Sequence, residues 1–472
     1  MKTTAPSSLT DLEAVDAVEA MRSGSLTSET YARALLDRAA ALASLNAFRA
    51  FAPERVLESA RAADRDRAAG KRLGRLHGLP IPVKDSVNTR EWPTSNGTLA
   101  LKDFRPREDA AVLRPLLTEG AIVMGKTNIH ELSRSWTCNN GAFGPVLNPY
   151  DPTRIPGGSS GGSGVAVAAR MAPIAVGEDT LGSIRVPATL CGVVGFRPTF
   201  GRYPGDGIMP LTFDRFDQAG PLARSVADVV LFDDVLAGET KPVSPKPLHT
   251  ARIGLSDFLL STLHPDVERI TNQAIDKLAA AGAVLVRAET PPGAREAFNI
   301  ARAIIGFENT RSIAAFLRAQ GIPFTFEEIV AQASPNVRDF YKVEYTAEAH
   351  ERALHDRETL SAALGRYFAE HRLDALLFPP VLMPALPLGD NAEVELLGKR
   401  VLLRYVMARN TALSSVARLA SLTLPAGLTT DGLPVGVEMV ALPGQDRELL
   451  ALGMSVEKVL GKIPPPAIAT SS

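Results

Sequence analysis

Cysteine is scarce in this chain, since Cys138 and Cys191 are the only two among 472 residues. Two cysteines are too few for the disulfide framework that stabilises small secreted domains, and reduced thiols in a cytosolic protein are the better interpretation. Histidine is also sparse, with seven residues. His130-Glu131 lacks a second ligand at helical spacing, so we expect neither a metal site nor a cofactor.

An excess of charge of one sign is missing as well. Lys and Arg together number 51 and Asp and Glu 52, which gives a formal net charge of −1. This balance offers no electrostatic attraction for nucleic acid or an anionic membrane. No uncharged apolar run of about 18 residues occurs, because Arg170 and Arg418 interrupt the nearest candidates. The polar N-terminus lacks a signal-peptide pattern, and we expect a soluble, cytoplasmic protein.

Helical and extended patterns alternate along the chain. Short apolar runs predict strands at 79–83, 121–124, 174–176, 193–196, 253–255, 284–287, 375–378 and 422–426. Helical patterns fall at 110–119, 164–170, 225–236, 266–281 and 447–459. This alternation is typical of βαβ units, so we expect an α/β fold with a largely parallel sheet.

Four parts are expected in the chain. Residues 1–70 form an N-terminal helical region, and 71–290 carry the catalytic core. Residues 291–370 are almost entirely helical in pattern and form an insertion or cap that shapes the substrate entrance. Residues 371–472 return to strands and complete the core sheet.

The most informative stretch is glycine-rich and runs from 156 to 185. Its serines include those at 159, 160 and 183, and it holds no histidine. A flexible linker is disfavoured because a helix-forming Val-Ala run follows at once. A phosphate loop lacks its lysine, and the G-x-S-x-G match at Ser159 lacks a convincing histidine partner. A serine–lysine arrangement is a known alternative to Ser-His-Asp, and Lys84 upstream is a candidate base for it.

The chain resembles the amidase signature family. The likeness rests on Gly157–Gly164 followed by GEDTLGSIR at 177–185, on Lys84 in Pro82–Asp85, and on further motifs. Those further motifs are Lys126-Thr127-Asn128, Asn148-Pro149, GFRPT at 195–199, Gly201-Arg202, Gly220-Pro221, RSVAD at 224–228, LPAG at 424–427 and GLPVG at 432–436. Within the family, the chain is similar to the aryl-acetamide, mandelamide hydrolase and urethanase-like branch. The resemblance implies an α/β/α sandwich with a large mixed, mostly parallel central sheet covered by helices.

The resemblance also implies a Ser-cisSer-Lys triad. Ser183 would be the nucleophile, Ser159 the bridging serine after a cis peptide bond from Gly158, and Lys84 the base. A lysine acts as a base only when it is neutral, which a desolvated site favours. Asp85 would oppose this, but in an extended segment its side chain would point to the opposite face from that of Lys84.

The oxyanion hole is expected from the backbone N–H groups of Thr180, Leu181, Gly182 and Ser183. The family usually has glycine where this chain has Leu181, so either the backbone there is ordinary or the pocket is altered. Glu178 likewise replaces a more usual threonine. Supporting residues are Ser160 and Gly158, together with Asp179 and Arg185, which we expect to form a structural pair beneath the loop.

The loop at 133–144 should border the site, by its family position. Substrate-binding candidates are Ser133, Trp136, Thr137, Cys138 and Phe143. Trp136 and Phe143 could line an aromatic acyl pocket, with ordinary core packing as the alternative. For Cys138, a small buried residue is favoured over a nucleophile, because no histidine neighbour is evident.

The function expected from these features is C–N bond hydrolysis of small aryl or hydrophobic amides through an acyl-enzyme. A carbamate, urethane or ester hydrolase with the same triad is an alternative, motivated by Leu181. An amidotransferase-type subunit is a third hypothesis. The expected partner is a small-molecule amide or carbamate, and family analogy suggests a homodimer.

Overall fold

The computed structural model describes residues 8–213, 216–389 and 392–468. Its strands are β1 (Phe48–Phe51), β2 (Pro80–Lys84), β3 (Ile122–Thr127), β4 (Ile174–Asp179), β5 (Val194–Arg197), β6 (Gln218–Ala223), β7 (Arg252–Leu255), β8 (Val284–Arg287), β9 (Ala375–Phe378), β10 (Glu393–Leu396), β11 (Lys399–Leu402), β12 (Ala420–Leu428) and β13 (Pro434–Ala441). Its α-helices are α1 (Ala14–Ser23), α2 (Ser28–Ala41), α3 (Pro53–Ala68), α4 (Leu113–Thr118), α5 (Gly161–Ala168), α6 (Arg185–Cys191), α7 (Val226–Leu236), α8 (Pro265–Ala280), α9 (Ala297–Ala319), α10 (Phe326–Ala331), α11 (Pro335–Phe340), α12 (Ala347–His371), α13 (Leu403–Ala408), α14 (Thr411–Val416) and α15 (Asp446–Leu460).

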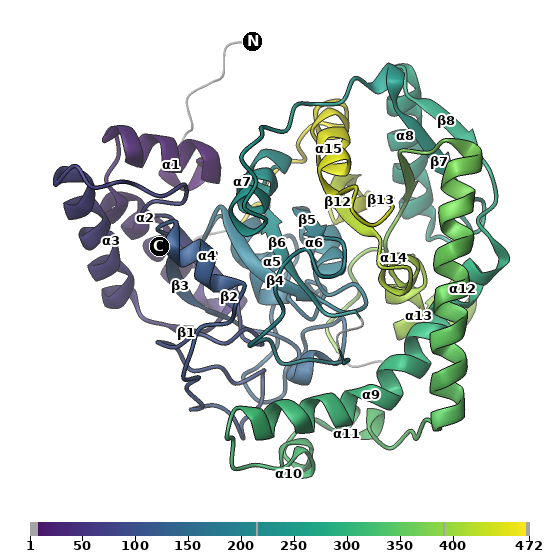
Figure 1. Ribbon diagram of the computed structural model, residues 1–472, viewed down its shortest axis with the longest axis horizontal. Coiled ribbons are helices and arrows are strands. Elements are labelled where there is room, and N and C mark those ends of the chain that lie inside the picture. Colours follow the sequence, from purple (N-terminus) through teal and green to yellow (C-terminus); the bar gives the residue numbers. More distant parts are fainter. Residues whose placement is uncertain (1–7, 214–215, 390–391, 469–472) are drawn as a thin grey trace.

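A mixed sheet forms the centre of the molecule, with helices packed around it (Figure 1). In the part of the chain that the structure describes, the sheet has 11 strands in the order β1-β3-β2-β4-β6-β5-β12-β13-β9-β7-β8. The expected α/β architecture and mixed sheet are confirmed. The expectation of mostly parallel strands is wrong, because six of the ten pairings between described strands are antiparallel.

The antiparallel majority comes from strands that the sequence patterns did not predict. Strand β6 contains Gly220 and Pro221, which are poor strand formers, yet it pairs antiparallel with both β4 and β5. Strand β13 follows β12 through a short turn, and such a connection can produce only an antiparallel pair. Strand β1 and the separate β10–β11 hairpin were also not predicted. Every strand that the apolar runs did predict is present.

The helical pattern of 292–370 is confirmed. Helices α9 and α12 are the long members and pack against each other. Helix α12 lies at the opposite end of the molecule from α1, α2 and α3, and α9 runs along the bottom of the view (Figure 1). Strands from 71–290 and from 371–472 share the single large sheet. The four-part division itself remains a prediction.

Three clusters of buried apolar side chains stabilise this arrangement. The largest joins the sheet to the helices that cover it. A second contains Leu181, Phe298 and Leu413, and a third contains Leu211, Ile313 and Val337. The second and third clusters join the helical segment to the core, and the cavity described below lies where they meet.

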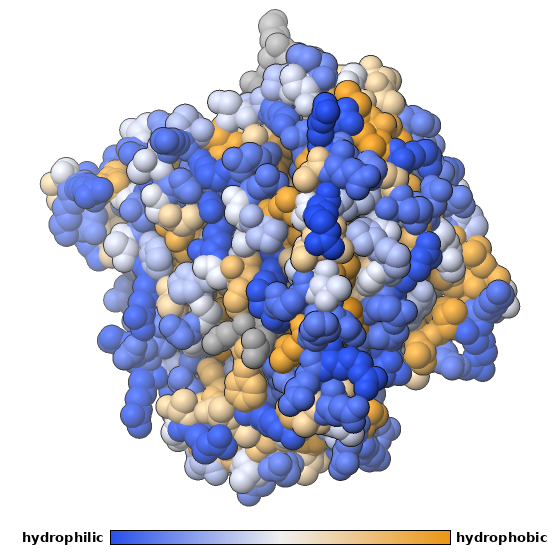
Figure 2. Space-filling model, turned by 45° about the vertical axis from the view of Figure 1, so that its right-hand side comes forward, coloured by the Kyte–Doolittle hydropathy of each residue, from blue (hydrophilic) through white to orange (hydrophobic). Residues whose placement is uncertain are grey.

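The face of the molecule in Figure 2 is largely hydrophilic, with hydrophobic side chains scattered among polar ones. Within the described residues, no helix has both the length and the apolar character needed to cross a bilayer.

Candidate active site

Lys84 is the last residue of β2, a strand whose residues are all buried, and its side chain has no exposed surface. Its Nζ atom lies 2.8 Å from Ser159 Oγ. The same atom lies 2.8 Å from Glu178 Oε2 and 3.0 Å from the Glu178 carbonyl oxygen. Three N–H groups of an ammonium therefore have three acceptors, which accounts for how a lysine is accommodated in the core.

Ser159 lies in the loop that leads into α5. The Gly158–Ser159 peptide bond is cis, as the family resemblance implies. Ser160 Oγ donates to the Glu178 carbonyl oxygen at 3.0 Å, which joins this loop to β4. The Ser159 carbonyl accepts the Cys138 thiol at 3.1 Å. The loop is thus held from both sides by neighbouring polar groups.

Ser183 lies in the turn between β4 and α6, where its backbone carbonyl accepts the Ser160 N–H at 3.2 Å. Its side chain borders a cavity of about 320 Å³. Among the described residues, no hydrogen bond joins the hydroxyls of Ser159 and Ser183. The structure therefore places Lys84 in contact with Ser159, and places Ser183 in a turn bonded to the neighbouring Ser160. The triad itself remains a prediction.

Asp179 and Arg185 form the expected structural pair beneath this turn. Arg185 Nη2 lies 2.9 Å from Asp179 Oδ1, and both side chains are fully buried. Burial alone would raise the pKa of Asp179, but the Arg185 guanidinium holds that pKa well below its usual range. Arg185 also contacts Glu438 at 3.0 Å. This network fixes the turn that carries Ser183.

The backbone N–H groups of the turn are not equally free. Gly182 N–H donates to Asp179 Oδ1 at 2.7 Å, so this expected oxyanion donor is already engaged. Thr180, Leu181 and Ser183 remain as candidate donors. Leu181 lies outside the left-handed region and adopts ordinary backbone geometry. Its side chain also borders the cavity, and its carbonyl accepts Trp136 Nε1–H at 2.9 Å.

Glu178 is one of two neighbouring carboxyl groups that sequence reasoning did not foresee, of which Glu178 is buried and Asp217 partly buried. Thr180 Oγ1 lies 3.0 Å from Glu178 Oε1 and also contacts Asp217 Oδ1. One hydroxyl hydrogen cannot be donated to both carboxylates, so one carboxyl group must carry a proton. Burial and the nearby Glu178 raise the pKa of Asp217 to about 7, which identifies Asp217 as that group. The only sequence signal was Glu178 in place of the usual threonine.

Asp85 does not approach the Lys84 amine, as expected from an extended segment. Its carboxylate instead accepts the Ser95 N–H at 3.2 Å. Burial raises the pKa of Asp85. The carboxylate that contacts Lys84 is therefore Glu178, from the neighbouring strand.

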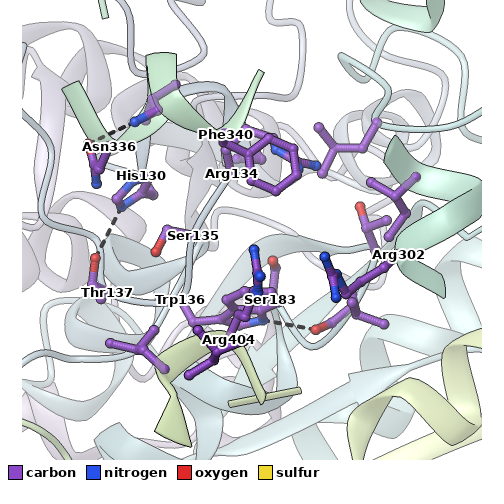
Figure 3. A pocket seen from close by; sticks show the side chains of 18 of the residues that line it. His130, Arg134, Ser135, Trp136, Thr137, Ser183, Arg302, Asn336, Phe340 and Arg404 are labelled. Carbon is purple, nitrogen blue, oxygen red and sulfur yellow. Dashed lines mark hydrogen bonds between the residues drawn. The ribbon is translucent and has the colours of Figure 1, made fainter. Parts of the chain in front are cut away.

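Three predicted substrate residues, Ser133, Trp136 and Thr137, border the cavity with Ser183. Figure 3 shows Trp136, Thr137 and Ser183. Cys138 and Phe143 are not among the described residues that line it. The Cys138 side chain is fully buried, and burial raises the pKa of its thiol to about 11, which disfavours a nucleophilic thiolate. The Phe143 ring lies 4.8 Å from the Arg49 guanidinium. For these two residues, substrate contact remains a prediction.

The rest of the cavity wall comes from segments that the motifs do not cover. The helical segment contributes Phe298, Arg302, Ile305, Asn336, Val337 and Phe340, and the end of β11 with the start of α13 contributes Leu402, Leu403 and Arg404. His130 is fully buried at this wall, and burial lowers its pKa to about 3, so its ring is neutral. Only the expectation that 291–370 shapes the substrate entrance pointed towards these residues.

Comparison with known proteins assigns the chain to a family. A model of the Amidase family matches residues 31–450. Mandelamide hydrolase from Pseudomonas putida is 36% identical over 491 residues, which cover 98% of this chain and 94% of that protein. Indoleacetamide hydrolase from Agrobacterium vitis is 37% identical over 434 residues, which cover 90% of this chain and 92% of that protein.

A solved structure shows the same relationship in three dimensions. Native peptide amidase from Stenotrophomonas maltophilia superposes with a TM-score of 0.85 and 30% sequence identity, covering 98% of this chain and 99% of that chain. The chain therefore belongs to the amidase family. It is a hydrolase of amide C–N bonds.

Proposed function

We propose that this protein hydrolyses small aryl or hydrophobic amides, with Ser183 as nucleophile, Ser159 as bridging serine and Lys84 as base. The observation that carries the proposal is the 2.8 Å contact between Lys84 Nζ and Ser159 Oγ beside a cavity that Ser183 borders. A buried lysine next to a serine, with a second serine at a substrate-sized cavity, is what acyl transfer without histidine requires.

The proton path follows from the hydrogen-bond geometry. In the neutral form, two N–H groups of Lys84 donate to the Glu178 carbonyl and to Oε2, and the lone pair faces Ser159 Oγ. Ser159 then passes its proton to Lys84 and accepts the proton of Ser183 as Ser183 Oγ attacks the amide carbon. The proton returns along the same path to the leaving nitrogen as the C–N bond breaks, and water then hydrolyses the acyl-enzyme.

Glu178 orients the amine in this path. Its Oε2 atom and its carbonyl oxygen accept two N–H groups of Lys84, so the lone pair of the neutral amine meets Ser159. The contact between Nζ and Oε2, at 2.8 Å with both side chains buried, suits this effect. Glu178 is therefore a positioning residue for Lys84.

The negative charge of the tetrahedral intermediate requires donors that are not already engaged. The N–H groups of Thr180, Leu181 and Ser183 meet this requirement, whereas Gly182 donates to Asp179. The cavity wall contains Trp136, Phe298 and Phe340 near Ser183, which suits an aryl or other apolar acyl group. The names of the two relatives, mandelamide hydrolase and indoleacetamide hydrolase, both denote aryl-bearing acetamides and support this substrate class.

The test is turnover by the purified chain on arylacetamides, matched aryl carbamates and matched aryl esters. We expect amide hydrolysis by the chain alone, and a loss of roughly 1,000-fold or more in kcat for Ser183→Ala. The control is Ser135→Ala, because Ser135 borders the cavity but has no lysine contact. Full activity of Ser183→Ala would contradict the triad. Preference for carbamates would favour the urethanase alternative, and activity only with added partner subunits would favour the amidotransferase alternative.

A further inference from the structure

Three arginines border the cavity next to Ser183. Arg134 comes from the loop that follows β3, Arg302 from α9 and Arg404 from α13. Figure 3 shows the side chains of Arg302 and Arg404 extending into the region where Ser183 lies. Among the described residues that line this cavity there is no aspartate or glutamate. The wall is therefore cationic, although the chain as a whole has a net charge of only −1.

None of these arginines has an acidic partner among the described residues. Arg302 donates to the Tyr345 hydroxyl at 3.3 Å, and its guanidinium lies 5.8 Å from the Phe298 ring centroid. The Nε atom of Arg404 is buried and has no hydrogen-bond partner. Nearby Arg400, by contrast, is highly exposed and pairs with Glu393 at 3.0 Å. The unpaired arginines are thus the ones that face the cavity.

Arg134 is held in a different way. Its guanidinium stacks 3.4 Å from the Phe340 ring centroid and 5.5 Å from that of Tyr341, and its Nε is also buried without a partner. This stacking fixes Phe340 at the cavity wall. We therefore assign Arg134 to the support of the apolar wall, and Arg302 and Arg404 to ligand recognition.

Arg302 and Arg404 are close enough to repel each other. Burial and the positive charge of Arg302 both lower the pKa of Arg404. An arginine nevertheless stays charged at neutral pH. An anion between the two side chains would relieve the repulsion and supply the missing acceptors. Guanidinium groups match the planar geometry of a carboxylate with two parallel hydrogen bonds.

We propose that the substrate of this amidase carries a carboxylate, remote from the scissile amide, which Arg302 and Arg404 bind. Trp136, Phe298 and Ile305 line the same cavity and would contact the apolar or aryl body of the substrate. The proposal rests on the proposed function, because it places the anion relative to an amide at Ser183. It adds a negative charge to the aryl or hydrophobic character that the proposed function gives to the substrate.

The experiment compares substrates that differ in charge but not in shape. Phenylacetamide bearing a carboxylate in the para or meta position is measured against the same amide bearing a nitro group, which is neutral and nearly isosteric. For wild type we expect kcat/KM to be roughly tenfold or more higher for at least one carboxylate than for its nitro isostere, mainly through KM. Rising ionic strength should reduce this ratio.

Arg302→Met and Arg404→Met should each bring the carboxylate-to-nitro ratio close to one. The matched control is Arg311→Met, which lies on the same helix as Arg302, is exposed and has its guanidinium 3.9 Å from the Phe307 ring centroid. It should keep the wild-type ratio. Thermal melting followed by circular dichroism checks that every variant is folded.

A wild-type ratio at or below one for both positional isomers, or a ratio that survives both arginine substitutions, would overturn the carboxylate subsite while amide hydrolysis stands. Failure of wild type to hydrolyse any of these amides, charged or neutral, would instead overturn the proposed function, and the subsite with it.

Discussion

The Nζ atom of Lys84 lies 2.8 Å from Oε2 of Glu178, and both side chains are withdrawn from solvent. This carboxylate stabilises the ammonium form of the lysine, whereas the proposed reaction needs the neutral amine. The same contact orients the amine towards Ser159. The pair therefore sets the geometry of the base and favours its charged form.

Replacing Glu178 with glutamine should raise kcat/KM on the acid limb of its pH profile relative to wild type. The amide keeps an acceptor for Lys84 but removes the negative charge that favours the ammonium. Glu178→Thr should instead lower kcat, because the threonine side chain is too short to reach Nζ and orient the amine. Profiles of kcat/KM against pH measure both effects. Asp85→Asn is the matched control, since Asp85 is a buried carboxyl turned towards Ser95, and it should leave the limb in place.

A profile of Glu178→Gln that coincides with that of wild type would show that the carboxylate does not act on the base. Glu178 would then be a structural residue only.

Lys84→Met should destabilise the fold by about 3–5 kcal/mol, because it leaves the Glu178 carboxylate buried without its partner. Adding Glu178→Gln to Lys84→Met should recover at least about 1 kcal/mol of the loss, since the uncompensated charge is then removed. Urea denaturation followed by circular dichroism measures both. The control is Lys71→Met, which breaks the exposed pair with Asp66 at 2.6 Å and should cost under about 1 kcal/mol. Equal stability of the single and double variants would argue against a charged pair.

Asp217 should make the free energy of unfolding fall as pH rises. Its pKa is raised from an ordinary 3.8 to about 7 by burial and by Glu178, so the folded protein keeps this proton to higher pH than the unfolded chain. The stabilisation is complete below about pH 3.8 and is lost as pH rises through about 7.

Denaturation at pH 5 and pH 8 tests this sign. In Asp217→Asn the loss of stability between the two pH values should be smaller than in wild type by about 1–2 kcal/mol, a value discounted for partial exposure. Asp257→Asn, at an exposed carboxyl, should behave as wild type. A loss in Asp217→Asn as large as that in wild type would contradict the proton assignment.

Leu181→Gly should widen the cavity at Ser183. The kcat/KM of a naphthylacetamide relative to phenylacetamide should rise by roughly tenfold, because removing a buried leucine side chain opens space while the backbone N–H remains. The free energy of unfolding should fall by about 2–5 kcal/mol. Leu413→Ala, in the same apolar cluster but away from the cavity, should lose stability without changing selectivity. An unchanged substrate ratio in Leu181→Gly would show that this side chain does not limit the cavity.

Much of the fold could be predicted because strands with continuous apolar runs, such as β2 and β9, need only their own residues to show that they are buried. Strand β6 could not be predicted, because Gln218, Gly220 and Pro221 carry no strand pattern. Its pairing is decided by β4 and β5 on either side. The expectation of mostly parallel pairings was wrong for the same reason, because packing decides which strands become neighbours.

The sequence alone pointed to Lys84, Ser159 and Ser183 as the residues of the proposed chemistry, because the motifs that carry them resemble those of the amidase signature family. Tertiary structure decided what surrounds them. Glu178 and Asp217 meet only because β4 and β6 are neighbours, and Arg302 and Arg404 reach Ser183 only because α9 and α13 pack over the same cavity. Contacts between residues of such distant segments arise from packing, and no local sequence pattern encodes them.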